Sequence, residues 1–133
     1  GYGVADPEVI MALETVRSPF SVNRLAQRAA TAALKDRDFL QKTRQMTIEG
    51  REYLTKELKD IGFEVLPSEA NFLMISPEPL GLTATEVYDY LSKNNIIIRN
   101  LSGFRGIKGE WIRITVGKPD QNKYLIKTLK NVK

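Results

Sequence analysis

The chain has 133 residues, of which 20 are basic and 16 acidic, giving a net charge of +4, and it contains neither cysteine nor histidine. The missing residue types exclude disulfide bonds, thiolate zinc sites and Ser-His-Asp triads. The hydrophobic fraction of 42% is enough to fill one core, and the charged fraction of 27% is ordinary, so we expect a globular domain and not a disordered chain. No apolar run is long enough to cross a bilayer, so we do not expect a membrane protein.

The first third of the sequence predicts helices. In "ADPEVIMALETVR", Asp6 precedes Pro7 and apolar residues recur at helical spacing, which predicts a capped helix ending near "RSPFS" (17–21). The alanine-rich segment 21–34 predicts a second helix, for which Ser21 is a plausible cap. Near its start, Asn23 is also most simply interpreted as a capping residue.

The remaining sequence predicts a small sheet with helices. Segment 36–62 has the pattern of a long amphipathic helix with one solvated face, for which Gly62 suits the C-terminal cap. The later elements are strands 63–67, 71–76, 96–100 and 110–117, helices 83–95 and 119–132, and a glycine-rich loop at 101–109. Thr83 and Glu86 have capping-box spacing. The order predicts an α+β fold with long N-terminal helices and about four short strands that carry helices on one face.

Two arginines occupy matching positions on neighbouring predicted strands. In 110–117, Ile112 and Ile114 share one face, so Arg113 points to the other, and in 96–100 Arg99 shares a face with Ile97. If these strands pair through the 101–109 loop, both guanidinium groups project toward one region. A guanidinium binds a carboxylate or phosphate through two parallel hydrogen bonds, which indicates an anion site. An ordinary exposed sheet face is the alternative interpretation of each arginine.

Three further features of the sequence bear on a possible ligand. Asn71, before "FLMIS", is either a strand-entry residue or a polar contact to a ligand. The glycines of "GFRG" (103–106) precede a strand and not a helix, so they lack the context of a phosphate-binding loop. The basic residues form no block interleaved with aromatic residues, so no nucleic-acid partner is expected.

Four segments in order carry a resemblance to a known family. "GYGVADPEVI", "SPFSVNRLAQRAA", "SEANFLMIS" and "IIIRN" followed by "WIRITVGKPDQN" resemble the C-terminal portion of fold type I aminotransferases that depend on pyridoxal 5'-phosphate. The resemblance covers essentially the whole chain. Within the family it is greatest to the histidinol-phosphate aminotransferase branch, which acts in histidine biosynthesis.

The resemblance implies roles for the polar residues. Arg113 corresponds to the small-domain arginine that binds a substrate carboxylate, and Arg99 to a second arginine near the substrate phosphate. Since histidinol phosphate has no α-carboxylate, both arginines are expected to serve its phosphate, and Arg113 the carboxylate of glutamate in the 2-oxoglutarate half-reaction. Asn71 matches the family's "ANF" asparagine, for which the resemblance implies a site-lining role.

The resemblance also implies a division of the chain. Residues 1–20 would end the large cofactor domain, 21–62 would form long interdomain and small-domain helices, and 63–133 would form the small substrate-binding domain. The Schiff-base lysine and other cofactor-binding groups are expected upstream of Gly1, so we expect a truncated segment that does not transaminate alone, with no catalytic, cofactor or metal ligands of its own. Its uncovered apolar surface is expected to cause self-association.

Several alternatives remain open at this point. The family resemblance also includes aromatic aminotransferases and threonine-phosphate decarboxylase, and a non-enzymatic anion-binding α+β module is a third possibility. The aminotransferase interpretation implies a homodimer, a phosphorylated amine or amino acid and glutamate or 2-oxoglutarate as small-molecule partners, and a cytoplasmic location.

Overall fold

The computed structural model describes residues 1–132 as two compact units, one of residues 1–39 and one that begins at Leu40. The first unit contains α1 (Pro7–Val16) and α2 (Arg24–Lys35). As predicted, Asp6 caps α1, since its Oδ1 accepts the Glu8 amide at 2.9 Å. The Asn23 Oδ1 accepts the Ala26 amide at 2.8 Å and caps α2, so the expected cap at Ser21 is wrong by two residues.

Helix α3 (Arg37–Ile61) leads into the second unit and ends in a Schellman motif. The Gly62 amide donates to the Lys59 carbonyl at 3.0 Å, and the Phe63 amide donates to the Leu58 carbonyl at 3.0 Å. Gly62 takes the φ of +113° that this cap requires, so the prediction for this glycine is confirmed. Phe63, assigned to a strand from the sequence, instead completes the cap and is buried.

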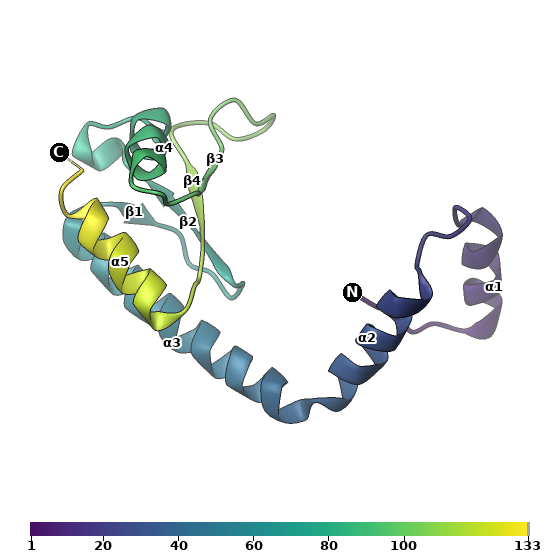
Figure 1. The fold of residues 1–133 in the computed structure, drawn as a ribbon. Helices are drawn as coiled ribbons and strands as arrows, with labels where there is room; N and C mark the ends of the chain where they lie inside the picture. Colours follow the sequence, from purple (N-terminus) through teal and green to yellow (C-terminus); the bar gives the residue numbers. More distant parts are fainter. Residues whose placement is uncertain (133) are drawn as a thin grey trace. The chain divides into compact units, whose positions relative to one another are not determined.

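A four-stranded antiparallel sheet with the order β1-β2-β4-β3 forms the centre of the second unit (Figure 1). The strands are β1 (Glu64–Val65), β2 (Phe72–Ser76), β3 (Arg99–Asn100) and β4 (Ile112–Thr115). A short 3₁₀ helix, η1 (Glu78–Leu80), follows β2, and α4 (Ala84–Lys93) and α5 (Pro119–Leu129) follow β2 and β4 in the chain.

Helices cover one face of this sheet because each strand alternates apolar and polar residues. The buried side of the sheet includes Leu73, Ile75, Ile112 and Ile114, all at most 2% exposed. The same core cluster takes in buried residues from α3, α4 and α5, namely Leu54, Leu58, Ala84, Val87, Leu91, Leu125, Ile126 and Leu129. The expected α+β fold with helices on one face of a short sheet is therefore confirmed.

The strands are shorter than the sequence patterns predict. β3 keeps only residues 99–100 of the predicted 96–100, and β1 only 64–65 of 63–67. Asn95 has a φ of +58° and turns the chain after α4, and residues 96–98 then pass the core without joining the ladder to β4. β4 ends at Thr115, and Asn122 holds the loop that follows, because its side chain bonds both backbone groups of Gly117.

Within residues 1–132, no helix combines the length and apolar character needed to cross a bilayer.

Candidate functional site

Arg99 and Arg113 are direct cross-strand partners. The register of β3 and β4 places Arg99 opposite Arg113 and Asn100 opposite Ile112. Both arginines are exposed and lie on the sheet face that the helices leave uncovered, whereas Ile112 and Ile114 point into the core. We call these two residues the arginine pair. The predicted pairing of their strands is therefore present, over fewer residues than expected.

Each guanidinium group of the arginine pair lies over an aromatic ring. The Arg99 Cζ is 5.3 Å from the centroid of the Phe104 ring, and the Arg113 Cζ is 5.3 Å from the centroid of the Phe72 ring. Among residues 1–132, the ion pairs of the structure involve neither arginine. Two positive charges therefore lie side by side without an acidic neighbour bonded to them, an arrangement that suits an anionic ligand.

Phe72 and Phe104 are not among the candidate residues predicted from the sequence. A signal for Phe72 was present, since alternation in "FLMIS" places it opposite Leu73 and Ile75, on the face of the arginine pair. Phe104 lies in the loop between β3 and β4, where no periodicity applies. Its neighbour Arg105 is exposed in the same loop.

Asn71 lies directly before β2, at the end of the sheet that faces α3. Its carbonyl accepts the Val116 amide at 2.9 Å, and the residue lines a hollow with Arg44 and Arg51 of α3. Arg51 holds this turn, because its guanidinium donates to the Ala70 carbonyl at 3.1 Å and to the Glu69 carboxylate at 2.8 Å. The structure therefore brings Arg99 and Arg113 together and leaves Asn71 beside α3.

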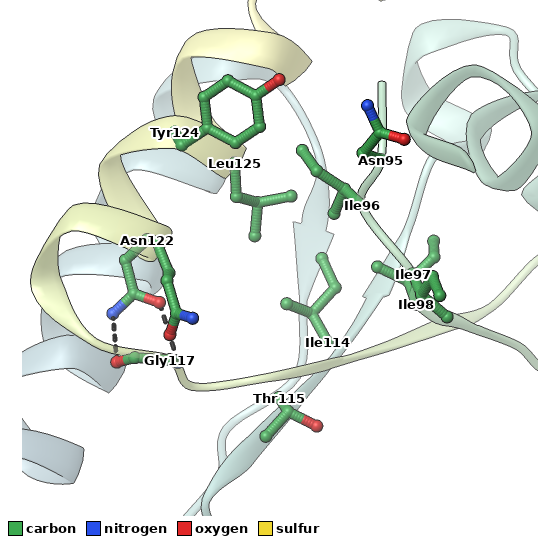
Figure 2. A pocket seen from close by; sticks show the side chains of 11 residues that line it. Asn95, Ile96, Ile97, Ile98, Ile114, Thr115, Gly117, Asn122, Tyr124 and Leu125 are labelled. Atoms are coloured by element: carbon green, nitrogen blue, oxygen red, sulfur yellow. Dashed lines mark hydrogen bonds between the residues drawn. The ribbon is translucent and has the colours of Figure 1, made fainter. Parts of the chain in front are cut away.

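A cavity of about 370 Å³ lies where residues 95–98 diverge from the end of β4 (Figure 2). Ile96, Ile98 and Leu125 contribute apolar walls, and Tyr124 and Asn95 lie at its polar side. Asn122 also lines it, but its side chain is already used by Gly117, as the dashed lines of Figure 2 show. The cavity therefore combines apolar walls with polar groups, of which the Asn122 side chain is already bonded.

A comparison with models of known protein families assigns the chain to one of them. The model of the aminotransferase class I and II family matches residues 1–129. The chain belongs to this aminotransferase family. The resemblance inferred from its sequence motifs is thereby confirmed.

Individual members of the family show the same relationship. A histidinol-phosphate aminotransferase of Symbiobacterium thermophilum is 42% identical over 130 residues, which are 98% of this chain and 35% of that protein. The histidinol-phosphate aminotransferase structure from Clostridium acetobutylicum has a TM-score of 0.83 at 26% identity and covers 94% of this chain and 37% of that one. The chain thus spans about a third of the length of the curated relatives it matches.

The aminotransferase family implies pyridoxal 5'-phosphate as cofactor. A histidinol-phosphate aminotransferase structure from Sinorhizobium meliloti, with a TM-score of 0.78 and 27% identity over 95% of this chain and 34% of that one, is a complex with this compound. A lysine that forms an imine needs an enclosed site that lowers its pKa. Every described lysine of the aminotransferase chain, from Lys35 to Lys130, is exposed.

The other polar groups of the aminotransferase chain give no sign of a cofactor cradle. Among the described residues, no buried side-chain nitrogen or oxygen lacks a hydrogen-bond partner, and no cluster of acidic residues has the geometry of a metal site. Residues 1–132 therefore do not fit pyridoxal phosphate by themselves. The chemistry that their geometry supports is the binding of anions on the open face of the sheet.

Proposed function

We propose that the chain supplies the substrate-binding small domain of a histidinol-phosphate:2-oxoglutarate aminotransferase, in which Arg99 and Arg113 hold the anionic groups of the substrates. The observation that carries the proposal is the arginine pair, two guanidinium groups on opposed residues of one exposed sheet face, neither of which takes part in an ion pair among residues 1–132. The names of relatives that are 35–42% identical support the choice of substrate.

A phosphate monoester matches the arginine pair in charge and in shape. It carries between one and two negative charges at neutral pH and presents three acceptor oxygens. Each guanidinium offers parallel donors in one plane, so two of them can bind different oxygen atoms of one phosphate group. A single carboxylate has only two oxygens and one charge, and one arginine is enough to bind it.

This difference assigns separate roles to the two arginines. Both hold the phosphate of histidinol phosphate, and Arg113 alone holds a carboxylate of glutamate or 2-oxoglutarate in the other half-reaction. Arg113 is the better candidate for binding both ligands because its strand, β4, is held on both sides, by β2 and by β3. Asn71 is retained as a residue that lines the site, next to the turn held by Arg51.

The proposal also covers the parts that surround this domain in an aminotransferase. It assigns residues 1–20 to the end of a cofactor domain, 21–62 to long interdomain and small-domain helices and 63–133 to the substrate domain. The active protein would be a cytoplasmic homodimer that contains pyridoxal 5'-phosphate, and the present residues alone would bind substrate without amino transfer.

Binding to the 133-residue chain tests the proposal directly. Histidinol phosphate, added to ¹⁵N-labelled chain and followed by NMR, is expected to shift the amides around Arg99 and Arg113 with a Kd on the order of 1 mM, because exposed charge pairs are screened by water. Histidinol without the phosphate is expected to leave these amides unshifted. O-Phosphothreonine serves as the competing ligand that a related decarboxylase would prefer.

Matched arginine variants complete this experiment. Arg99→Ala is expected to weaken the binding of histidinol phosphate far more than the binding of glutamate. Arg113→Ala is expected to weaken the binding of both ligands. Arg105→Ala, an exposed arginine of the adjacent loop, is the control. Equal losses for both ligands in Arg99→Ala, or no shift at all with histidinol phosphate, contradict the proposed role, and tighter binding of O-phosphothreonine redirects it to the decarboxylase branch.

A further inference from the structure

We propose that Phe72 and Phe104 are positioning residues that hold the arginine pair ready for its ligand, and that Phe104 acts selectively on the phosphorylated substrate. The inference rests on the proposed function of the arginine pair and extends it to the two aromatic residues beside the pair. The two ring contacts, both at 5.3 Å, are the observation that carries it.

Two like charges on directly opposed strand residues repel each other. Long exposed arginine side chains relieve such repulsion by moving apart, and each has many rotamers available in water. In this structure, each guanidinium instead lies over a different ring, Arg99 over Phe104 and Arg113 over Phe72. Phe72 belongs to β2, the neighbour of β4, and Phe104 belongs to the loop that follows β3.

A ring restrains a guanidinium without occupying its hydrogen-bond donors. The cation is attracted to the face of the ring within about 6 Å of the centroid, while the N–H groups point outward in the guanidinium plane. An acidic partner would instead neutralise the charge and use those donors. Stacking on Phe72 and Phe104 therefore reduces the side-chain entropy lost on binding while leaving charge and donors available to an anion.

The backbone of the 101–109 loop explains how Phe104 reaches Arg99. The Phe104 amide donates to the Leu101 carbonyl and the Ile107 amide to the Phe104 carbonyl, both at 3.1 Å, which makes two consecutive turns. Gly103 and Gly106 have φ values of +80° and +90°, a region that favours glycine. The glycine spacing of "GFRG", which does not suit a phosphate-binding loop, thus serves to present the phenylalanine between the two glycines.

Because the rings contact different arginines, their removal should affect different ligands. Phe104→Leu is expected to raise the Kd of histidinol phosphate about two- to fivefold and to leave that of glutamate unchanged. Phe72→Leu is expected to raise the Kd values of both ligands. Phe104→Tyr and Phe72→Tyr keep an aromatic ring, so they should restore the affinity. Phe39→Leu, an exposed phenylalanine of α3, is the control, and all values come from NMR titration of the 133-residue chain.

A second measurement needs no variant. A guanidinium and its neighbouring CH₂ group stacked on a ring are shifted upfield by the ring current, so the Arg99 and Arg113 side-chain protons should lie upfield of those of Arg105. If the Arg99 and Arg113 side-chain protons are not shifted upfield of those of Arg105, the inference is wrong.

The outcomes separate the two proposals. If Arg99→Ala weakens histidinol phosphate but Phe104→Leu does not, or if the tyrosine variants bind as weakly as the leucine variants, the positioning role is wrong and the proposed function stands. If Arg99→Ala leaves the affinity for histidinol phosphate unchanged, the proposed function itself falls and the positioning role with it.

Discussion

Asn122 joins the end of β4 to the first turn of α5. Its Oδ1 accepts the Gly117 amide at 2.9 Å and its Nδ2 donates to the Gly117 carbonyl at 3.0 Å, and the residue is only 3% exposed. Helix α3 packs closely at this point. A Cβ on Gly50 would lie 2.7 Å from Val116 Cγ1 and 2.9 Å from Asn122 Nδ2, so only glycine fits there without a shift of its neighbours.

We predict that Asn122→Ala lowers the free energy of unfolding by about 2 kcal/mol, since the two backbone groups of Gly117 lose their partner and a space opens beside α3. Urea denaturation followed by circular dichroism measures the change. Asn131→Ala is the control, because its exposed amide donates one bond to the Lys127 carbonyl and should cost little. Equal stability of Asn122→Ala and the unsubstituted chain would contradict this account of the β4–α5 junction.

At the scale of residues, alternation was enough to place Arg113 on the open face of the sheet, because Ile112 and Ile114 must both be buried. The same reasoning placed Arg99. The ring contacts were beyond sequence reasoning, since they depend on the strand order β2-β4-β3 and on a loop conformation that no periodic pattern encodes. The surroundings of Asn71 were equally hidden, because they depend on where α3 passes.

Among the elements, helix α4 has an N-terminus that several capping hydrogen bonds stabilise. The Thr83 Oγ1 accepts the Glu86 amide at 3.2 Å, and the Glu86 carboxylate accepts the Thr83 amide at 2.8 Å. The carboxylate of Glu110, from the segment before β4, also accepts the Ala84 amide. The backbone and hydroxyl donors of Thr83 lower the pKa of Glu86, because they bind its charged form.

We predict that Thr83→Ala destabilises the chain by about 1 kcal/mol through loss of the cap. A lowered pKa means that the stabilising contribution of Glu86 is complete above its unfolded pKa and is lost as pH falls through the folded value. The variant removes the hydroxyl donor and keeps the backbone amide donor at position 83, so the pKa of Glu86 should rise only part of the way toward its ordinary value, which ¹³C NMR of its side-chain carboxyl group can measure. An unchanged pKa in Thr83→Ala would show that the Thr83 hydroxyl does not contribute to the lowered pKa of Glu86.

The elements also show where sequence patterns lose accuracy. Thr83 and Glu86 mark the start of α4 because capping is a local interaction, and Gly62 marks the end of α3 for the same reason. The ends of β3 and β1 were overestimated because "IIIRN" and "FEVLP" are apolar enough to pack on the core without forming a ladder. Burial and strand pairing are separate requirements, and hydrophobicity reports only burial.

For the whole molecule, the contrast between the two units is the main feature. Residues 1–39 contain no buried residue, and their exposed apolar side chains include Val4, Val16, Phe20 and Leu25, each at least 80% exposed. A ten-residue helix such as α1 is marginal in water unless its apolar face is covered. The unit that begins at Leu40, in contrast, holds the entire core cluster.

We predict that the 133-residue chain associates with itself through residues 1–39, because a second copy is the partner available to the purified chain for this apolar surface. Sedimentation velocity between about 1 and 100 μM should show species larger than the monomer. A chain that starts at Leu40 keeps the core and should remain monomeric. A monomer across this range for the full 133 residues would contradict the prediction.

The aminotransferase proposal concerns a larger whole, since the chain spans 35% of the Symbiobacterium thermophilum relative that it matches at 42% identity. The most direct test of the arginine pair replaces the matching segment of that relative with this chain and measures kcat/KM for both substrates. We predict that Arg99→Ala lowers kcat/KM for histidinol phosphate by about 10- to 100-fold and that for glutamate less than threefold, with Arg105→Ala as control. Equal losses for the two substrates in Arg99→Ala, or no loss for either, would contradict the central claim that the arginine pair binds the substrate phosphate.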